Sequence, residues 1–342
     1  MNFNPFKTIL PFLVLFLVYS CGENKPKNKT DESTTVLTAK AYTGTASITQ
    51  GIATTLLEDI YECDRGRKTD VGEITSTDGK KWTVPAETNY TNENFPFAVD
   101  LYNACEGKNY NTAQEAMSHY NDLDIVEIDN DGEVFTAYIF ADNYFEMYVN
   151  GKPVGKDKVP FTQFNSSVIK FKAHRPFTIA MKLVDWEEYL GIGCEENREK
   201  PFHAGDGGMV AVIKNKKEET IAITNKDWKA QTFYTAPIID LNCISEDGAY
   251  RYSKNCDTNG GKDGSKFYAL HWQIPEGWMH TNFDDSNWQD ASTYTNETIG
   301  VDNKPSYTNF TTLFDDPNKD AQFIWTTNVI LDNEVLVRHT VE

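Results

Sequence analysis

The feature that most constrains the fold is a series of short segments in which apolar and polar residues alternate, beginning near residue 124. Successive side chains of a β-strand point to opposite faces, so this alternation is typical of a strand with one face in a core. Residues 133–140 show the pattern, and their apolar face carries Phe135, Ala137 and Ile139. Residues 144–149 repeat it, and Asn150-Gly151 follows them as the strongest short-range signal for a β-hairpin.

Further strands are predicted by the same pattern. They cover residues 168–172, 177–184, 208–213 and 220–223. A closing hairpin is expected from residues 322–331 and 334–338, joined by a turn at Asp332-Asn333. Short strands separated by turn signals indicate a mainly β fold. We therefore predict an antiparallel β-sandwich of the jelly-roll type over residues 124–342.

The amino-terminal third gives mixed signals. Residues 46–62 carry apolar residues at mostly helical spacing, which predicts a helix. Thr112 and Glu115 form a capping-box pattern, which predicts a short helix that ends near Tyr120. Residues 36–123 are therefore expected to form a smaller, partly helical α+β portion that packs on the sandwich.

Composition and charge limit the partners. Hydrophobic residues make up 39% and charged residues 24% of the 342 positions, which excludes a coiled coil, a polytopic membrane protein and wholesale disorder. Asp and Glu number 51 against 32 Lys and Arg, so the formal net charge is −19. A nucleic-acid-binding protein needs a basic face to displace counterions, and no cluster of Lys and Arg here is dense enough to form one. We expect no nucleic-acid partner.

The first residues combine a short apolar run with a cysteine that follows it closely. Residues 9–18 form an apolar run that is too short to span a bilayer and is typical of a signal-peptide core. Val18-Tyr19-Ser20-Cys21 then resembles the lipobox of bacterial lipoprotein signal peptides, although the tyrosine departs from the usual choice. The resemblance implies that residues 1–20 are removed, that Cys21 is acylated, and that residues 21–35 form a polar tether. Such a protein is held on a bacterial membrane by lipid and faces the periplasm or the cell surface. A plain secretory signal is the alternative.

Five further cysteines agree with export to an oxidising compartment. None has the CxxC spacing of zinc or thioredoxin sites. Cys63 and Cys105 both lie in the amino-terminal third, and Cys243 and Cys256 bracket a polar loop. We therefore predict these two disulfides and a free Cys194. In the alternative, Cys194 pairs with Cys243 or Cys256.

Three motifs occur in a fixed order between residues 130 and 295. They are DNYFEMYVNGKPVG at residues 142–155, NKDWK at residues 225–229, and FDDSNW at residues 283–288. Together they resemble galactose-binding-like β-sandwich modules, above all the non-catalytic amino-terminal modules of bacterial α-L-rhamnosidases. The resemblance implies a sugar-recognition fold without catalytic residues, because the residues after 295 are too few for that family's catalytic helical barrel. Phe283 and Trp288 are expected to anchor a loop in the core.

The candidate sugar-binding residues lie in a long polar loop, residues 185–208, between two predicted strands. Long loops on a rigid scaffold commonly carry binding residues. Aromatic rings can stack on a sugar, and polar side chains can bond its hydroxyls. The candidates are Trp186, Glu187, Tyr189, Arg198, His203 and Asp206. The alternative is a loop that covers the sandwich and buries Trp186 against it.

Catalytic and metal-binding motifs are sparse. The chain has no HExxH, no GxSxG and no Gly-rich phosphate loop after a strand. Glu187 and Glu188 are adjacent, so on a strand they would point to opposite faces, which does not suit a glycosidase pair. No cofactor is expected beyond a candidate structural Ca²⁺, for which an acidic Gly-rich loop offers Asp257, Asn259 and Asp263.

These observations favour a membrane-anchored lipoprotein with a non-catalytic, carbohydrate-binding β-sandwich and a glycan as its partner. Two alternatives stay open at this point. The first is a glycan-active hydrolase or lyase that uses the amino-terminal portion or the loop of residues 185–208. The second is a structural or assembly lipoprotein that uses the sandwich for protein contacts.

Overall fold

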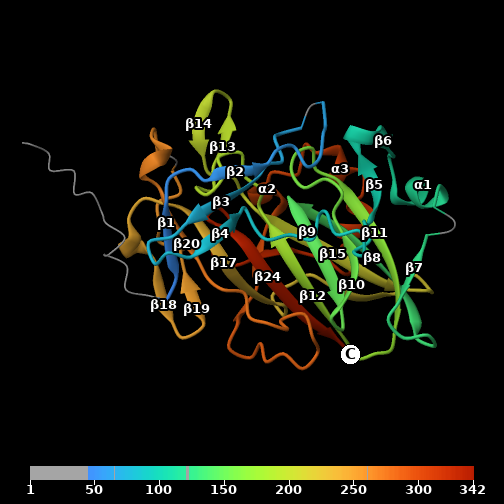
Figure 1. Cartoon of the computed structure of the whole chain (residues 1–342). Coiled ribbons are helices and arrows are strands. Elements are labelled where there is room, and N and C mark those ends of the chain that lie inside the picture. The colour runs from blue at the N-terminus through green and yellow to red at the C-terminus, as the bar shows by residue number, and fades with distance from the viewer. Residues whose placement is uncertain (1–44, 65, 121–122, 260) are drawn as a thin grey trace, which may run out of the picture. The chain divides into compact units, whose positions relative to one another are not determined.

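A computed structural model of the chain describes residues 45–342 except 65, 121–122 and 260. Its described residues confirm the mainly β fold, because two large sheets of mostly antiparallel strands dominate and the helices are short (Figure 1). The longest helix in these residues has six residues, so the fold depends on sheet packing rather than on helices. None of the described helices is long and apolar enough to cross a membrane.

The first large sheet has eight strands. Its order is β1 (Ser47–Gln50), β20 (Tyr268–His271), β17 (Lys229–Ile238), β24 (Asp332–Val341), β12 (Phe177–Val184), β9 (Tyr144–Val149) and β10 (Lys152–Lys156), with β21 (Gln289–Asp290) against β17. The second has nine strands. Its order is β22 (Ser292–Tyr294), β23 (Phe323–Trp325), β15 (Gly208–Asn215), β8 (Glu133–Asp142), β11 (Ser166–Ala173), β5 (Val99–Asn103) and β6 (Lys108–Asn109), with β16 (Thr220–Ile223) against β15 and β7 (Ile125–Glu127) parallel to β11.

Smaller elements surround these sheets. A three-stranded sheet contains β2 (Thr54–Leu57), β3 (Val71–Thr75) and β4 (Lys81–Val84). Two hairpins are formed by β13 (Glu195–Asn197) with β14 (Lys200–His203), and by β18 (Ser245–Asp247) with β19 (Tyr250–Tyr252). The helices are α1 (Ala113–Ser118), α2 (Asn296–Ile299), α3 (Pro305–Thr308) and α4 (Thr311–Phe314), and 3₁₀ turns cover Ala104–Glu106, Leu241–Cys243 and Gly264–Lys266.

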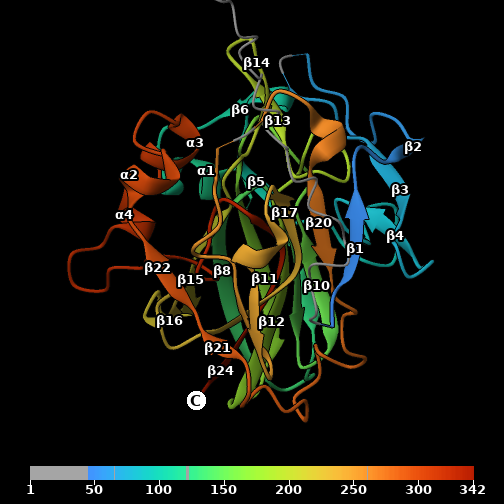
Figure 2. The ribbon, with the colours of Figure 1, turned by 90° about the vertical axis from the view of Figure 1, so that its left-hand side faces the viewer.

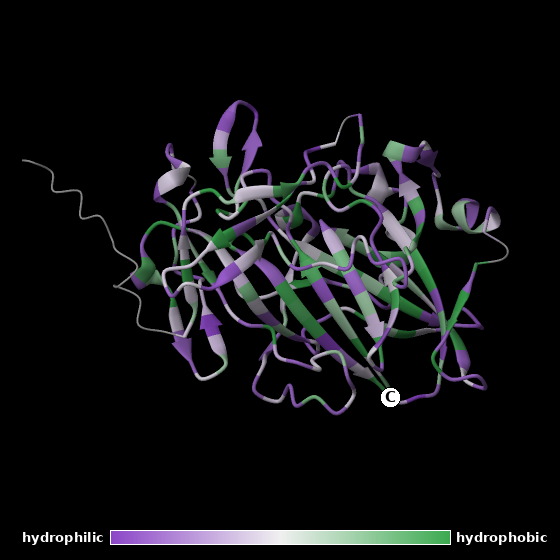
Figure 3. Ribbon diagram, viewed as in Figure 1, coloured by the Kyte–Doolittle hydropathy of each residue, from purple (hydrophilic) through white to green (hydrophobic). Residues whose placement is uncertain are grey.

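The main hydrophobic core contains side chains from both large sheets, which makes the fold a β-sandwich. The expected alternation places Phe135, Ala137 and Ile139 of β8 in this core, together with Ile179 and Met181 of β12. Figure 3 shows apolar residues recurring along the long strands, whereas polar residues gather at the tip of the β13–β14 hairpin. Burying one face of each strand supplies the hydrophobic free energy that holds the two sheets together.

Several local predictions are confirmed. Asn150 and Gly151 have positive φ of 51° and 81° and join β9 to β10 as a tight hairpin. Thr112 caps α1, because its side chain accepts a hydrogen bond from the Glu115 amide. Trp288 is buried and Phe283 packs edge-on against it at 5.5 Å, which anchors the FDDSNW segment.

The helix predicted over residues 46–62 is wrong. The structure has β1 and β2 there, separated by Gly51, whose φ of 80° interrupts any regular helix. Ile48 is buried in the eight-stranded sheet, whereas Ile52 and Leu56 are exposed, so the apolar residues do not share one helical face. Spacing alone therefore misassigned a segment whose first strand pairs with β20, more than 200 residues away, and whose second strand pairs with β3.

The closing hairpin predicted over residues 322–338 is also wrong. β23 and β24 belong to different large sheets and do not pair with each other. Asp332 and Asn333, the predicted turn, are buried at the start of β24. Residues 326–331 therefore connect the two sheets, and Trp325 Nε1 donates to the Asp332 carbonyl at 2.7 Å.

The two large sheets also take strands from before residue 124. β1 forms one edge of the eight-stranded sheet, and β5 and β6 form one edge of the nine-stranded sheet. Residue 124 therefore does not separate an independent amino-terminal portion from the sandwich. Most of the regular structure before it is β, and α1 is its one α-helix among the described residues.

Both predicted disulfides are present. Cys63 is bonded to Cys105 and Cys243 to Cys256, and Cys194 is free and buried. Burial raises the pKa of the Cys194 thiol well above its ordinary value, so it stays protonated and unreactive at neutral pH.

Candidate functional site

The outer face of the eight-stranded sheet carries charged side chains, and amino-terminal residues cover it. Lys182 of β12 points away from the core, because its neighbours Met181 and Leu183 face inward. Its Nζ donates to the Glu87 carbonyl at 2.5 Å, and nearby Glu146 accepts from Asn89 Nδ2 at 2.9 Å. Buried polar groups need such partners, so these bonds fix the segment after β4 on the sheet.

A hollow lies between β4 and the end of β20, and we call it the groove. It consists of two adjoining cavities of about 310 and 250 Å³. Both are lined by the same five residues: Lys80, Trp82, His271, Trp272 and Gln273. Figure 2 shows the strands that form it, with β3 and β4 beside β1 and β20.

A half-exposed tryptophan forms one wall of the groove. The Trp82 ring stacks on the His271 ring at 5.0 Å with 21° between their planes. His271 in turn stacks on Tyr234 at 4.7 Å and 11°. Burial lowers the pKa of His271 to about 3, so the imidazole is neutral and packs as an uncharged ring. This stack of three rings fixes the plane of Trp82, which lines the groove.

Packing beneath the small sheet explains why β4 lies over β20. Ile74 of β3 and Val84 of β4 are buried in a cluster with Leu190 and Ala269. The Thr77 amide donates to the Ile48 carbonyl of β1 at 2.8 Å, which joins the small sheet to the large one. β4 therefore presents Trp82 on a rigid support rather than on a mobile loop.

One end of the groove is lined by two carboxylates, and we call it the carboxylate end. Glu334 of β24 is almost fully buried there, with an oxygen 3.2 Å from Lys182 Nζ. Burial raises the pKa of Glu334. Glu87 is exposed to solvent and lines the same cavity, as does Lys81. This end therefore offers hydrogen-bond acceptors together with the positive charges of Lys80 and Lys81.

The other end is lined by an arginine, and we call it the arginine end. Arg251 comes from the β18–β19 hairpin and lies 4.6 Å from the Phe233 ring and 4.6 Å from the Trp272 ring. Its guanidinium also donates to the Thr232 carbonyl. Trp272 Nε1 donates to Glu246 on the same hairpin. The hairpin is thus bonded to the residues that line the groove.

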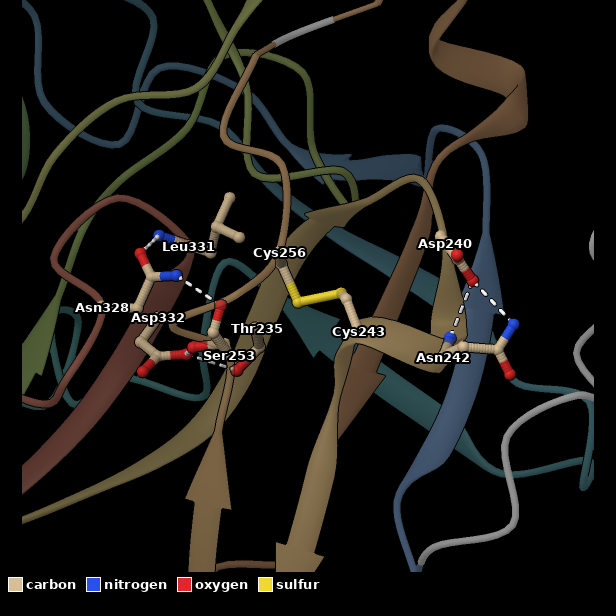
Figure 4. Close-up of a disulfide and its surroundings, with 9 residues drawn as sticks. All are labelled: Thr235, Asp240, Asn242, Cys243, Ser253, Cys256, Asn328, Leu331 and Asp332. Carbon is tan, nitrogen blue, oxygen red and sulfur yellow. Dashed lines mark hydrogen bonds between the residues drawn. A yellow bond between two sulfur atoms is a disulfide. The ribbon is translucent and has the colours of Figure 1, made fainter.

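A disulfide closes the base of that hairpin. Figure 4 shows Cys243 and Cys256 bonded directly before β18 and after β19. Next to it, Asp332 accepts from Thr235 Oγ1 at 2.7 Å and from Ser253 Oγ at 3.0 Å. These bonds tie the hairpin to β17 and β24. The position of Arg251 is therefore set by covalent and polar links to the large sheet.

The residues predicted from the loop of residues 185–208 do not form one exposed surface. Trp186 is only 1% exposed; its Nε1 donates to the Asp70 carbonyl, and its ring packs on Tyr144. Glu187 is buried and accepts from the Tyr234 hydroxyl at 3.1 Å. Burial raises the pKa of Glu187 to about 8. The capping alternative is therefore the one the structure supports for Trp186, which cannot stack on a sugar.

The remaining loop candidates are scattered. Tyr189 packs on Phe202 at 4.7 Å. Arg198 and His203 are exposed on the β13–β14 hairpin. Asp206 is partly buried, and burial raises its pKa to about 6. None of these four lines the groove.

The loop considered for calcium forms ordinary turns. Asp257 accepts from the Asn259 amide at 2.9 Å, and Asp263 accepts from the Ser265 amide at 3.1 Å. Such bonds from an aspartate to the backbone two residues on are typical of turns. Among the described residues, no group of three or more His, Cys, Asp or Glu side chains could hold a metal ion.

The sequence reasoning missed Trp82, Trp272 and Glu334. A signal for Trp82 was present in DGKKWT, a tryptophan within a polar, turn-like segment, but its partner His271 lies 189 positions later in the chain. Residues 1–20, the lipid-attachment candidate Cys21 and the tether of residues 21–35 lie outside the described residues. No protein family, curated protein or solved structure that was compared matches this chain.

Proposed function

We propose that this protein is a membrane-anchored lipoprotein whose β-sandwich binds carbohydrate without catalysis. The observation that carries the proposal is the groove, in which Trp82 is held flat by the His271 and Tyr234 rings. A sugar ring presents CH groups on its face and hydroxyls around its edge. A fixed aromatic ring suits the face, and directional polar groups suit the hydroxyls.

Polar side chains that can bond the hydroxyls of a sugar line the same cavity as Trp82. Gln273 offers an amide, Glu87 and Glu334 offer acceptors, and Lys80 and Lys81 offer donors. They come from rigid strands or from residues next to them, which limits the entropy lost on binding. The glycan-binding residues proposed here are therefore different from the loop residues predicted from the sequence.

The anchor is the second part of the proposal, and the sequence alone supports it. The apolar run and the lipobox-like Val18-Tyr19-Ser20-Cys21 favour acylation of Cys21. Two or more acyl chains give a stable membrane anchor, whereas one is marginal. The two disulfides agree with a location in the periplasm or on the cell surface.

A glycan array with the detergent-solubilised full chain tests the binding. We expect a defined set of oligosaccharides to bind to the chain and to lose affinity in Trp82→Ala. Metabolic labelling with a palmitate analogue tests the anchor, with Cys21→Ala as the unlabelled comparison. Labelling that persists in Cys21→Ala would reject the anchor, and an array without any bound glycan would reject the binding function.

A glycoside hydrolase is the second candidate, and one observation favours it. Glu87 and Glu334 line the same cavity, and burial raises the pKa of Glu334, as a general acid requires. The salt bridge from Lys182 opposes it, because a paired carboxylate gives up its charge less readily. Release of reducing sugar by the wild type, lost in Glu334→Gln, would favour the hydrolase.

A further inference from the structure

Two carboxyl groups and one amide are buried together between β10 and the nine-stranded sheet. Asp157 directly follows β10, and its amide donates to the Phe145 carbonyl of β9 at 2.9 Å. Asp100 belongs to β5 of the nine-stranded sheet, and Asn165 directly precedes β11 of that sheet. Each of these three residues is 1% exposed. They form a polar cluster, closed to solvent, with members from both sides of the sandwich.

The N–H groups of this cluster are already in use. Asn165 Nδ2 donates to Asp100 Oδ1 at 2.7 Å and to Ser167 Oγ at 3.3 Å, which accounts for both of its hydrogens. Asn103 Nδ2 donates to Asp100 Oδ2 at 2.8 Å, and Lys108 Nζ lies 3.8 Å from the same oxygen. Both oxygens of Asp100 therefore receive donors, which suits an ionised carboxylate.

Two buried oxygens of the cluster are left without a donor. They are Asp157 Oδ2 and Asn165 Oδ1. The Asn165 side chain lies within hydrogen-bonding reach of the Asp157 carboxyl group, whose Oδ1 accepts from the Val159 amide at 3.0 Å. Turning the Asn165 amide over would leave its oxygen facing Asp100 instead. In either orientation a carboxylate faces an amide oxygen, and buried acceptors without a donor are destabilising.

A proton on Asp157 satisfies both oxygens. A protonated aspartate has an O–H donor, which Asn165 Oδ1 can accept, while Asp100 keeps its charge and its N–H donors. Burial, together with the nearby Asp100 charge, raises the pKa of Asp157 well above its ordinary value, which agrees with this assignment. Burial also raises the pKa of Asp100, but the amides of Asn103 and Asn165 and the charge of Lys108 act against that rise.

The surrounding titratable groups do not compensate a charge on Asp157. Lys108 lies 3.1 Å from Glu106, and Lys158 pairs with Glu106 as well. The other neighbours are phenols whose pKa burial raises, so they are uncharged at neutral pH: Tyr61, Tyr90 and Tyr144. Among the described residues no Lys, Arg or His forms an ion pair with Asp157. Ionisation would therefore place a second buried negative charge beside Asp100.

We propose that a proton held by Asp157 links the two sheets at this edge, and that its release to solvent as pH rises separates β10 from β11. The proposal is independent of the carbohydrate-binding function. A cavity of about 110 Å³ already lies along the edge, lined by Val154 of β10 and by Val168 and Ile169 of β11. The sheets are incompletely packed there, so repulsion between two carboxylates acts where separation disrupts few contacts.

Hydrogen–deuterium exchange of the full chain in detergent tests the separation. Exchange is measured between pH 5 and pH 9 and corrected for its intrinsic dependence on pH. Amides of β10 and β11 should exchange at least about tenfold faster at the high end, whereas β1 and β20, at the opposite edge of the eight-stranded sheet, keep their protection. Unchanged protection in β10 and β11, or an equal loss along the whole chain, would overturn the proposal. This measurement needs no variant.

Asp157→Asn removes the titration and keeps a donor for Asn165 Oδ1. Because a raised pKa stabilises the folded state at low pH, the wild type should lose stability relative to this variant as pH rises. In chemical denaturation, the ratio of the wild-type to the variant unfolding constant should increase about tenfold per pH unit while only the folded state holds the proton. Asp157→Ala is the control that lacks the donor and should be less stable than Asp157→Asn at every pH.

The results of these variants decide the role of the proton. The same pH dependence in the wild type and in Asp157→Asn would mean that Asp157 is ionised in the folded state and would reject the proposal. Asp157→Asn that is no more stable than Asp157→Ala would exclude the bond to Asn165. Exchange at β10 and β11 that still rises with pH in Asp157→Asn would assign the separation to another group.

Discussion

Trp82 and Trp186 are both tryptophans in polar surroundings of the sequence, yet the structure uses them in opposite ways. Trp186 lies in the long loop of residues 185–208 and is 1% exposed, with its ring against Tyr144 and its Nε1 bonded to backbone. Trp82 lies in a short strand, is partly buried and lines the groove. The loop tryptophan is a core residue, and the strand tryptophan lines the binding groove.

The difference teaches that exposure follows from what covers a residue rather than from the polarity of its neighbours in the chain. Asp70, near the start of β3, and Tyr144 of β9 cover Trp186, and both come from distant parts of the chain. Trp82 stacks on His271 and keeps enough exposure to line the groove. Four predictions can break or sharpen this comparison.

The largest effect is expected from Trp186→Ala. Removing a buried tryptophan leaves a cavity and should lower the free energy of unfolding by about 3–5 kcal/mol. Denaturant unfolding followed by circular dichroism measures this. Trp82→Ala is the matched control and should cost much less, because its ring is partly exposed. Equal losses for the two variants would contradict the assignment of one to the core and the other to the groove.

The disulfides give the next effect. Replacing Cys243 and Cys256 together by serine should lower the free energy of unfolding by about 3 kcal/mol, the chain-entropy value for a loop of this length. Glycan affinity should fall as well, because the β18–β19 hairpin that carries Arg251 is then held less firmly.

Replacing Cys63 and Cys105 by serine is the control for the groove. It should lower the free energy of unfolding by about 4 kcal/mol, since its loop is longer. The folded fraction of this double variant should bind glycan with the affinity of the wild type. Affinity that falls equally in both double variants at a temperature where both are folded would show that the hairpin has no special link to binding.

A smaller effect should appear in the dependence of stability on pH. Burial raises the pKa of Glu187 from 4.5 to about 8, so between these values the folded state holds a proton that the unfolded state has lost. Stability from this group is therefore present at low pH and decreases as pH rises toward 8, by at most about 1.4 kcal/mol per pH unit.

Glu187→Gln isolates this contribution. Gln removes the titration and keeps an acceptor for the Tyr234 hydroxyl. Between pH 5.5 and pH 7.5 the wild type should lose more stability than the variant in chemical denaturation. An identical loss in the two proteins would mean that Glu187 is ionised in the folded state.

The smallest effect in free energy is expected at the groove itself. Trp82→Ala should weaken glycan binding about tenfold, equivalent to about 1.4 kcal/mol, because the stacking surface is lost. Trp82→Phe should retain part of the affinity, since it keeps a smaller ring over His271. Isothermal titration calorimetry measures both. Unchanged affinity in Trp82→Ala would place the ligand elsewhere.

Much of the fold was predictable because it follows from patterns among residues that are close in the sequence. Alternation in β8 and β12 and the positive φ that Asn150-Gly151 tolerates are properties of neighbouring residues. The cysteine pairs could also be predicted, because the two members of each pair lie in the same part of the chain. By contrast, β1 depends on pairing with β20, and no local pattern contains that information.

The groove could not be predicted for the same physical reason. Trp82, Trp272 and Glu334 are brought together by the register of β4, β20 and β24, which is fixed by tertiary packing. The loop candidates failed because burial, rather than composition, decided the role of Trp186 and Glu187.

The place of β24 has a consequence for the order of folding. This strand, Asp332–Val341, pairs with β12 on one side and β17 on the other, so it lies between them in the eight-stranded sheet. During synthesis β12 and β17 emerge long before it, and residues 1–331 alone cannot join the two halves of that sheet. The ribosome must therefore deliver Asp332–Val341 before the sandwich can close. A nascent chain that lacks Asp332–Val341 therefore leaves β12 and β17 without the strand that joins them.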